Sequence, residues 1–325
     1  MSIGFSEMIM STSVAIICPT KDRPDKVRQL LASIVASDVQ PGQIIIADGG
    51  NNLKPVVAEF ADKLVLTCLY CPSQGQIMQR NHAHTHLLPG IELVLHLDDD
   101  ITLEADALAK ALAHWNEIQA LPGKPLGGMA FNIIDHPAKR NNLFRSLALM
   151  KVEPQGRVWA SGFASPHVPV SENTFSQWLI GGATMWARDV LESHPHPLSF
   201  QTRWAFCEDV LYSYPLSKTH RLAVCAAARA KHNDTYNNHP FAKRRFYAKT
   251  QVLMRNYLVA LNADLSSFAL IWMAVCQMFA YLAKGMFGDW RDIGSFLGTV
   301  DGIILVLRAG VFRQSAEILV RGLVK

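Results

Sequence analysis

Residues 91–100 read IELVLHLDDD, a largely apolar run that ends abruptly in three aspartates. Its length and composition are typical of a buried strand. Mutual repulsion makes three adjacent carboxylates costly unless a cation or hydrogen-bond donors neutralise them. Hard oxygen ligands favour Mg²⁺ or Mn²⁺, which often bridge to substrate phosphates. The stretch therefore predicts a strand whose carboxyl end binds a divalent cation. The alternative is an aspartate that caps a following helix.

Three similar apolar runs precede this one, and stretches with helical spacing separate them. We expect strands at residues 13–19, 43–47, 64–70 and 91–97, and helices at 26–35, 56–61, 76–88 and 103–120. Strands that alternate with helices predict an α/β fold, in which helices cover both faces of a mostly parallel sheet. In such sheets ligands bind at the carboxyl ends of the strands, so the polar residues there are the candidates for function.

The pattern is less regular beyond residue 120. We expect strands at 127–134 and 221–228, a strand or a turn followed by a strand at 178–188, and helices at 189–194, 208–219 and 241–261. Residues 135–177 are irregular and rich in Pro, Ser and His, which is typical of a variable binding surface. Neither the P-loop nor the Rossmann glycine motif occurs, so those two phosphate cradles are disfavoured.

Composition excludes several classes of protein. Of 325 residues, 50% are apolar and only 18% charged, which argues against disorder, collagen and coiled coil. Residues 1–110 carry 8 basic and 13 acidic side chains, whereas 218–255 carry 9 basic and 1 acidic. The first segment is thus suited to cations and the second to anions. Nucleic acid is one such anion, and a nucleotide diphosphate or an anionic lipid surface would serve equally well. The six cysteines are expected to be reduced thiols.

The hydrophobic excess lies at the carboxyl end. Residues 268–287 are long enough to span a bilayer, but Gln277 and Lys284 interrupt them, and residues 293–312 carry Asp301 and Arg308. Both segments are better suited to an interface or to packing as a helical pair than to crossing the membrane. We therefore expect residues 261–325 to be an amphipathic helical region that associates with the inner face of the membrane, on a cytoplasmic protein.

The polar strand ends, together with later motifs, resemble a family 2 glycosyltransferase with the GT-A fold. The motifs are PTKDRP (19–24), ADGG (47–50), GQIMQRNHA (75–83), LDDD (97–100), GGATMWAR (181–188) and CEDVLYSYPL (207–216). The resemblance implies a GT-A domain over 13–260, after a tail at 1–12, with a nucleotide-binding half at 13–120 and an acceptor-binding half at 121–260. It also implies a nucleotide-sugar donor, Mn²⁺ or Mg²⁺, and inversion of the anomeric centre. The resemblance implies no nucleic-acid partner.

By this resemblance the donor pocket is lined by Pro19, Thr20, Asp22 and Arg23. Asp48 is expected to bind the base, although a helix-capping role is the alternative. Arg80 and Asn81 are expected near the ribose and diphosphate, and Asp99 near the ribose or the donor sugar. The Asp-Gly-Gly sequence after the second strand departs from the commoner Asp-Asp-Gly-Ser, which weakens the assignment of the base contacts.

The resemblance also implies metal and acceptor residues. Asp98 and Asp100 would flank the metal, and His232 would complete its ligands, with a surface-loop histidine as the alternative. Gly181 and Gly182 would allow the backbone to approach a sugar closely, since they lack a Cβ, and the alternative is a tight turn or bulge. Trp178 is assigned to acceptor binding with these two glycines.

The acidic pair Glu208 and Asp209 carries the catalytic assignment, with Asp209 as the general base. A sugar hydroxyl is a poor nucleophile, so direct displacement needs a group that removes its proton. One carboxylate suffices for a single displacement. The alternative is an acidic pair that complements the dipole of a helix.

The sequence therefore predicts a metal-dependent transferase that moves a sugar, from a UDP- or dTDP-sugar by family frequency, to a glycan or lipid-linked acceptor in cell-surface polysaccharide synthesis. No Gln-x-x-Arg-Trp follows the acidic pair, which argues against a processive synthase. A nucleotidyltransferase is the enzyme alternative, but the place of its glycine-rich loop is taken by PTKDRP. A membrane-docked scaffold with a decayed active site is the non-enzyme alternative, although all the acidic motif residues are present.

Overall fold

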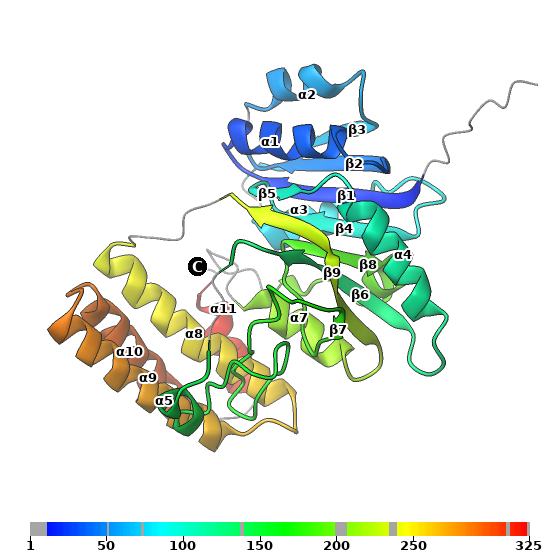
Figure 1. Ribbon diagram of the computed structural model, residues 1–325. Coiled ribbons are helices and arrows are strands. Elements are labelled where there is room, and N and C mark those ends of the chain that lie inside the picture. Colours follow the sequence, from blue (N-terminus) through cyan, green and yellow to red (C-terminus); the bar gives the residue numbers. More distant parts are fainter. Residues whose placement is uncertain are drawn as a thin grey trace, which may run out of the picture.

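The computed structural model describes residues 12–50, 52–72, 75–136, 140–198, 207–233, 239–309 and 313–323. The predicted tail at 1–12 lies outside these ranges, except for Thr12, which begins the first strand. Figure 1 shows a central sheet with helices packed around it and a group of helices at the carboxyl end that projects to one side.

The described residues form one mixed sheet with the strand order β3-β2-β1-β4-β8-β6-β9-β5, and β7 pairs with β9. Strands β1 to β4, β6 and β9 run in one direction, and β5, β7 and β8 run in the opposite one. The strands are β1 (Thr12–Thr20), β2 (Pro41–Asp48), β3 (Leu66–Tyr70), β4 (Leu93–Leu97), β5 (Ile101–Leu103), β6 (Leu126–Ile133), β7 (Thr174–Phe175), β8 (Ala183–Ala187) and β9 (Arg221–His232). The prediction of a mostly parallel sheet is confirmed.

Helices lie against both the first and the second half of this sheet. Helix α3 packs on β1 and β2, and α4 packs on β6 and β9. The helices are α1 (Pro24–Val35), α2 (Lys54–Phe60), α3 (Gln76–His84), α4 (Ala107–Gln119), α5 (Leu143–Leu147), α6 (Arg188–Ser193), α7 (Glu208–Leu216), α8 (Phe241–Leu261), α9 (Ser267–Phe287), α10 (Asp292–Ala309) and α11 (Arg313–Arg321).

The central strands are buried on both faces. Residues 14–18 of β1 and 44–47 of β2 are fully inaccessible to solvent. Because consecutive residues of a strand point to opposite faces, such runs need a layer of packing on each side. This is why the sequence shows continuous apolar runs there rather than alternation.

Several sequence-based boundaries differ from the structure. The helix expected at 103–120 begins only at Ala107, because residues 101–103 form β5, which pairs with the distant β9. The helix expected at 76–88 ends at His84. In these two cases long-range pairing or a turn overrides local propensity. The segment at 178–188 has a turn at 181–182 followed by strand β8 at 183–187, which is the second of its two expected forms.

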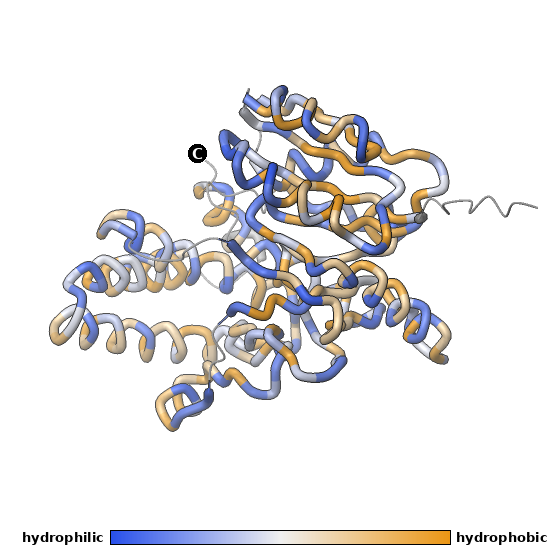
Figure 2. Tube along the Cα trace, turned by 45° about the horizontal axis from the view of Figure 1, so that its top comes forward, coloured by the Kyte–Doolittle hydropathy of each residue, from blue (hydrophilic) through white to orange (hydrophobic). Residues whose placement is uncertain are grey.

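The carboxyl-terminal helices pack closely on one another. Helix α10 lies on α8 and α9, as Figure 2 also shows for the group of helices beside the sheet. Gly294, Gly298 and Gly302 of α10 face α8, and a Cβ on Gly298 would overlap the carbonyl oxygen of Arg245. The small-residue face of α10 thus packs on α8. The two apolar segments, α9 and α10, also lie against each other, which is one of the two arrangements expected for them.

Candidate active site

The carboxyl ends of β1 and β4 meet at one edge of the sheet. Thr20, the last residue of β1, donates a hydrogen bond of 2.6 Å from Oγ1 to Oδ2 of Asp99, which follows β4. Parallel pairing of β1 with β4 brings these strand ends together. Pro19 lies in β1 paired with Ala47 and is buried there. The predicted edge is therefore formed.

Two arginines neutralise the aspartate cluster. Arg23 Nη1 lies 2.7 Å from Asp99 Oδ1, and its Nη2 lies 3.1 Å from Asp100 Oδ2. Arg80 Nη2 lies 2.8 Å from Asp98 Oδ1, which also accepts a 2.7 Å hydrogen bond from Gln76 Nε2. Burial raises the pKa of Asp98, and it raises that of Asp99 to about 6. The electrostatic repulsion among three adjacent carboxylates is thus offset by side chains from the loop after β1 and from α3.

Asp22 and Asp48 lie at the neighbouring strand end. Asp48 is buried and accepts a 2.7 Å hydrogen bond from the backbone N–H of Gly50, and burial raises its pKa. Asp22 has φ of 55°, and its carboxylate lies against Gly50, where there is no room for a Cβ. A left-handed aspartate is uncommon and strained, and such residues cluster at functional sites. The base-binding role of Asp48 stays a prediction.

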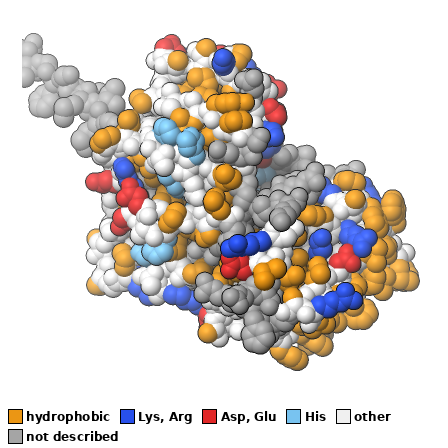
Figure 3. Space-filling model, turned by 180° about the vertical axis from the view of Figure 1, so that it is seen from behind, with side chains coloured by type: hydrophobic (Ala, Val, Ile, Leu, Met, Phe, Trp, Pro, Cys, Tyr) orange, Lys and Arg blue, Asp and Glu red, His pale blue; other side chains and the backbone are white. Residues whose placement is uncertain are grey.

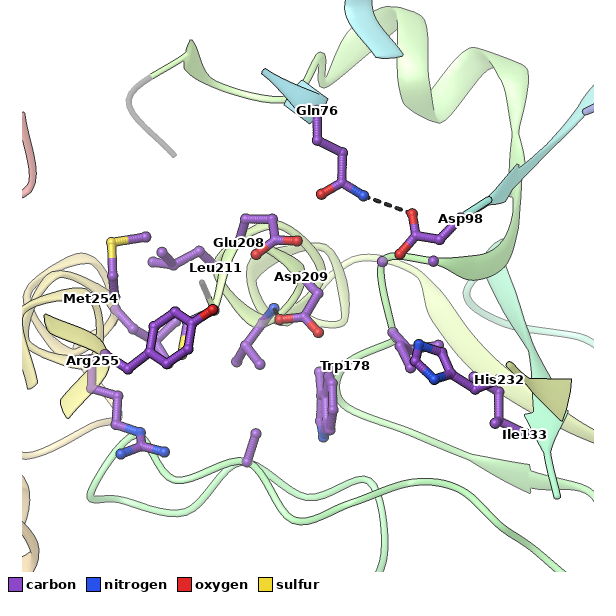
Figure 4. A pocket seen from close by; sticks show the side chains of 18 of the residues that line it. Gln76, Asp98, Ile133, Trp178, Glu208, Asp209, Leu211, His232, Met254 and Arg255 are labelled. Carbon is purple, nitrogen blue, oxygen red and sulfur yellow. Dashed lines mark hydrogen bonds between the residues drawn. The ribbon is translucent and has the colours of Figure 1, made fainter. Parts of the chain in front are cut away.

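A cavity of about 590 Å³ opens beside this edge. Figure 4 shows Asp98 and Gln76 on one side of it, Glu208 and Asp209 in the middle, and Met254 and Arg255 on the other side. Its lining thus joins α3, the end of β4, the turn before β8, the start of α7 and helix α8. This is the arrangement required of a site in which two substrates meet.

The acidic pair stands at the start of α7. Cys207, the residue before it, has φ of 62°, so the chain turns sharply and directs both acids toward the cavity. Burial raises the pKa of Glu208 well above its usual range and that of Asp209 to about 6. Asp209 Oδ1 accepts a 2.8 Å hydrogen bond from the N–H of Val210. Burial thus favours the protonated form in both acids, and the two carboxyl groups titrate as a pair.

Gly181 and Gly182 form a turn that lies between Asp98 and the acidic pair of Glu208 and Asp209. A Cβ on Gly181 would lie 3.4 Å from Arg80 Nη1 and 3.5 Å from Glu208 Oε1. A Cβ on Gly182 would collide with the carboxylate of Asp98, whose N–H donates a 2.9 Å hydrogen bond to Gly182 O. The close approach that needs glycine here is thus to the site's own side chains. Contact of these glycines with an acceptor stays a prediction.

Trp178 also lines the cavity. Its Nε1 donates a 2.8 Å hydrogen bond to Ser165 O, and its ring meets the ring of His167 edge to face. The residue is thus held in place by the irregular segment 135–177. An acceptor role for Trp178 agrees with its position and stays a prediction.

His232 lies close to the predicted metal ligands. Its Nε2 is 3.5 Å from Asp100 Oδ1, because Ile101 of β5 pairs with His232 of β9. Asp100 Oδ1 is buried and accepts no hydrogen bond from the described residues. Two carboxylates and an imidazole suit Mn²⁺ or Mg²⁺, so these residues fit the predicted cation. Within the described ranges, however, no group of three or more His, Cys, Asp or Glu has the spacing of a formed metal site.

Asn81 points away from the cavity. Its Nδ2 donates a 2.8 Å hydrogen bond to His196 O, next to a buried group of rings. His84 Nε2 lies 2.8 Å from His96 Nε2, and the ring of His196 stacks on Tyr212. Burial lowers the pKa of all three histidines, so they are neutral and support the fully buried Arg80 without adding charge. A ribose or diphosphate contact for Asn81 stays a prediction without support from its position.

Gln76 and Arg255 are among the lining residues that were not predicted from the sequence. Gln76 lies within the quoted GQIMQRNHA motif, but only the structure shows its bond to Asp98. Arg255 of α8 belongs to the basic segment 218–255, whose charge was assigned only to a diphosphate or a lipid surface. The structure divides that segment, since Arg244 binds Asp289 and Asp292, and Arg245 binds Asp301.

The sequence matches no protein-family model and no curated protein. Its structure is similar to that of the mannosyltransferase PcManGT from Pyrobaculum calidifontis, solved with GDP-Man and Mn²⁺. The TM-score is 0.52 at 16% identity, over 95% of this chain and 79% of that one. It is also similar to GalNAc-T7, solved with UDP, GalNAc and Mn²⁺, with a TM-score of 0.54 at 13% identity. That match covers 81% of this chain and 54% of the other. The fold is therefore that of the GT-A glycosyltransferases.

Proposed function

We propose that the protein is a metal-dependent, inverting glycosyltransferase of the family 2 type. It transfers a sugar from a nucleotide-sugar donor to a hydroxyl group of a glycan or lipid-linked acceptor. One observation carries the proposal: the edge that holds Asp98 to Asp100 and the acidic pair at the start of α7 line the same cavity. Donor activation and proton removal need two such groups on opposite sides of the reacting carbon.

The donor lies along the sheet edge in this proposal. Its diphosphate is held near Asp98 and Asp100, which with His232 are the residues that would bind Mn²⁺ or Mg²⁺. The cation, when bound, neutralises the charge of the diphosphate. UDP- and dTDP-sugars are the proposed donors. A guanine nucleotide remains a candidate because one structural neighbour was solved with GDP-Man.

Asp209 is the general base. In this proposal Asp209 is the ionised member of the pair and Glu208 the protonated one, which agrees with the direction in which burial shifts the pKa of Glu208. The acceptor hydroxyl transfers its proton to Asp209 as its oxygen bonds to C1 of the sugar and the bond from C1 to the diphosphate breaks. The nucleoside diphosphate leaves on the opposite face, so the configuration at C1 inverts. Glu208 can donate a hydrogen bond to the acceptor or the sugar, because it is neutral.

Donor binding tests the proposal directly. Thermal unfolding is measured with a panel of sugar nucleotides, with and without Mn²⁺. A ligand at 100 times its dissociation constant should stabilise the fold by about 2.7 kcal/mol. We expect one nucleotide to do so only with Mn²⁺, and Asp98→Asn to abolish that shift. Asp62→Asn, an exposed control, should preserve it. No shift with any nucleotide in folded wild-type protein would contradict the proposal.

We further propose that the protein is cytoplasmic and binds the inner face of a membrane through α9 and α5. Phe268 and Phe287 of α9 are 82% and 86% exposed, and Leu143 of α5 is 76% exposed. The two helices are joined where Trp272 Nε1 donates a 2.8 Å hydrogen bond to Leu147 O. Figure 3 shows apolar side chains gathered over the carboxyl-terminal helices, with lysines and arginines beside them.

Helix α9 is also the one described helix that is long and apolar enough to cross a membrane. Its buried residues, among them Leu270 and Met273, pack against Ala148 and Met150 of the acceptor-binding half. A helix held in this way by the rest of the chain lies on a membrane more readily than it spans one. This contact supports the peripheral arrangement. An acceptor of cell-surface polysaccharide synthesis would be delivered at that surface.

A further inference from the structure

Arg255 is a cation in the cavity that has no acidic partner among the described residues. It lies on α8, across Glu208 and Asp209 from Asp98 (Figure 4). Its Nη1 atom is buried and has no hydrogen-bond partner among the described residues, and Arg255 forms no ion pair with any of them. Withdrawing a guanidinium from water without a partner is costly.

The packing of Arg255 holds it in this position. Its guanidinium carbon lies 5.7 Å from the centre of the Phe163 ring, a cation–π contact. Gly162, with φ of 73°, turns the chain so closely beside α8 that a Cβ on it would lie 3.7 Å from the Cβ and the carbonyl oxygen of Arg255. The aliphatic part and the plane of the guanidinium are thus held at the cavity wall. Only the terminal nitrogens of the guanidinium are left to bind a ligand.

Other arginines of α8 are already paired. Arg244 binds Asp289 and Asp292 at 2.8 and 2.6 Å, and Arg245 binds Asp301 at 2.8 Å. At the sheet edge, Arg23 and Arg80 are paired with aspartates as well. Unlike these arginines, Arg255 has no acidic partner among the described residues. Its buried Nη1 atom can therefore still donate a hydrogen bond to a ligand.

The position of Arg255 indicates which substrate would use it. The proposed donor diphosphate lies by Asp98 and Asp100, and the acceptor hydroxyl must lie within hydrogen-bond reach of Asp209, on the face of the donor sugar opposite the diphosphate. A group on the far side of Asp209 from Asp98 therefore faces the acceptor. Guanidinium binds phosphate and carboxylate groups through two parallel hydrogen bonds.

We propose that Arg255 binds a phosphate or carboxylate group of the acceptor, so that the enzyme selects an anionic acceptor. This inference rests on the proposed function, because that function decides which end of the cavity holds the donor and which end holds the acceptor. The acceptor would place its hydroxyl at Asp209 and its anionic group at Arg255. A neutral acceptor would leave the guanidinium unpaired in the cavity, which is the physical basis of the selection.

Binding of simple sugars tests the inference without the donor. Glucose 6-phosphate, glucuronate and glucose serve as the probes, and their affinities are measured by isothermal titration or ligand-observed NMR. We expect the wild-type protein to bind one or both anionic sugars at least about tenfold more tightly than glucose, as a charge-assisted hydrogen bond would give. The two anionic probes distinguish a phosphate site from a carboxylate site.

Two variants and a control assign the effect to Arg255. Arg255→Gln should reduce the preference for the anionic sugar to about twofold or less, and Arg255→Lys should keep part of it, since a lysine keeps the charge without the fork. Arg308→Gln, which removes an exposed arginine of α10, should leave the preference unchanged. Thermal unfolding of each variant checks its fold, and if Arg255→Gln does not fold, the Arg255→Lys comparison decides.

Three results with the sugars would overturn the inference, and a fourth result comes from nucleotide binding. The first three are a wild-type protein that binds the three sugars equally, a preference that survives Arg255→Gln, and a preference in a folded Arg255→Lys protein equal to that of wild type. A nucleoside diphosphate that loses tenfold in affinity with Arg255→Gln would assign the residue to the donor instead and also overturn it. Failure of the proposed function appears elsewhere, as absence of nucleotide binding in the wild-type protein.

Discussion

The sheet edge and helix α8 both line the cavity, but their charged side chains differ in whether they have a partner of opposite charge. At the edge, Arg23 and Arg80 pair with three consecutive aspartates, so each of these carboxylates has a charged partner within the protein. On α8 the pairing is incomplete, because Arg244 and Arg245 have acidic partners in the described structure and the buried nitrogen of Arg255 has none. The comparison indicates that the edge is preorganised for its ligand, whereas the α8 wall is completed by a ligand.

The largest effect is expected at the centre of the cavity. Asp209→Asn should lower the rate of sugar transfer by about 10²- to 10⁴-fold, because it removes the base, and should leave nucleotide affinity within about twofold. The rate is measured by following release of the nucleoside diphosphate. Asp189→Asn is the matched control, since Asp189 stands at the start of α6 and accepts the same 2.8 Å hydrogen bond from the next N–H. Transfer near the wild-type rate in Asp209→Asn would remove the base assignment.

The ion pair between Arg80 and Asp98 at the sheet edge can be removed by substituting Arg80. Arg80→Met should lower the free energy of unfolding by about 2–4 kcal/mol, because it leaves the partly buried carboxylate of Asp98 without its charged partner. Urea unfolding measures the change. Arg28→Met removes the exposed pair with Glu59 and should change the unfolding midpoint little. Equal shifts for the two variants would mean that the edge does not depend on the buried pair.

The carboxyl-terminal helices differ from the edge in their exposed apolar side chains. Replacing both Phe268 and Phe287 by Ser should weaken binding to vesicles of anionic lipids by about tenfold or more, since each phenyl group buried is worth about 1.5–3 kcal/mol. Sedimentation with vesicles measures binding. Phe175→Ser, at an exposed position of β7, is the control. Identical loss in the control and the double variant would contradict docking through α9.

The smallest effect concerns pH. A base acts only when ionised, and burial places the pKa of Asp209 at about 6. Transfer should therefore be fully developed above about pH 7 and fall toward tenfold per pH unit below about pH 6. Because burial also raises the pKa of Asp99 to about 6, nucleotide affinity is measured over the same range to separate binding from chemistry. A rate that stays flat from pH 7 to pH 5 would contradict the ionised Asp209.

Much of the fold was predictable because it depends on local pattern. The runs at residues 13–19, 43–47 and 91–97 became β1, β2 and β4, and the helix expected at 241–261 has those bounds as α8. Strand β5 was missed because three residues carry no signal of their own, and their pairing with β9 connects positions about 130 residues apart. Helix α11 was also missed, in a stretch that the sequence assigned to one amphipathic region.

Some residues of the candidate site were also predictable from the sequence, and the positions of others were not. Asp98 to Asp100, Glu208 and Asp209 were identified by residue type and by position at the ends of elements. The structure brings Asp98, Glu208 and Asp209 to one cavity, with Asp99 and Asp100 next to Asp98 in the chain. Asn81 was assigned from its motif alone, and the structure turns it toward His196. The direction of a helical side chain depends on which face of the helix is packed, and the motif does not contain that information.

The sequence by itself determined the α/β architecture and the acidic groups, since hydrophobic periodicity and strand-end chemistry are local properties of the chain. Only the tertiary structure decided which charges are paired. It gave Asp98 its partner Arg80, placed His232 beside Asp100 through the pairing of β5 with β9, and left the end of Arg255 unpartnered across the cavity. Charge pairing acts over a few ångströms between residues far apart in the chain, so it follows from packing and not from spacing along the sequence.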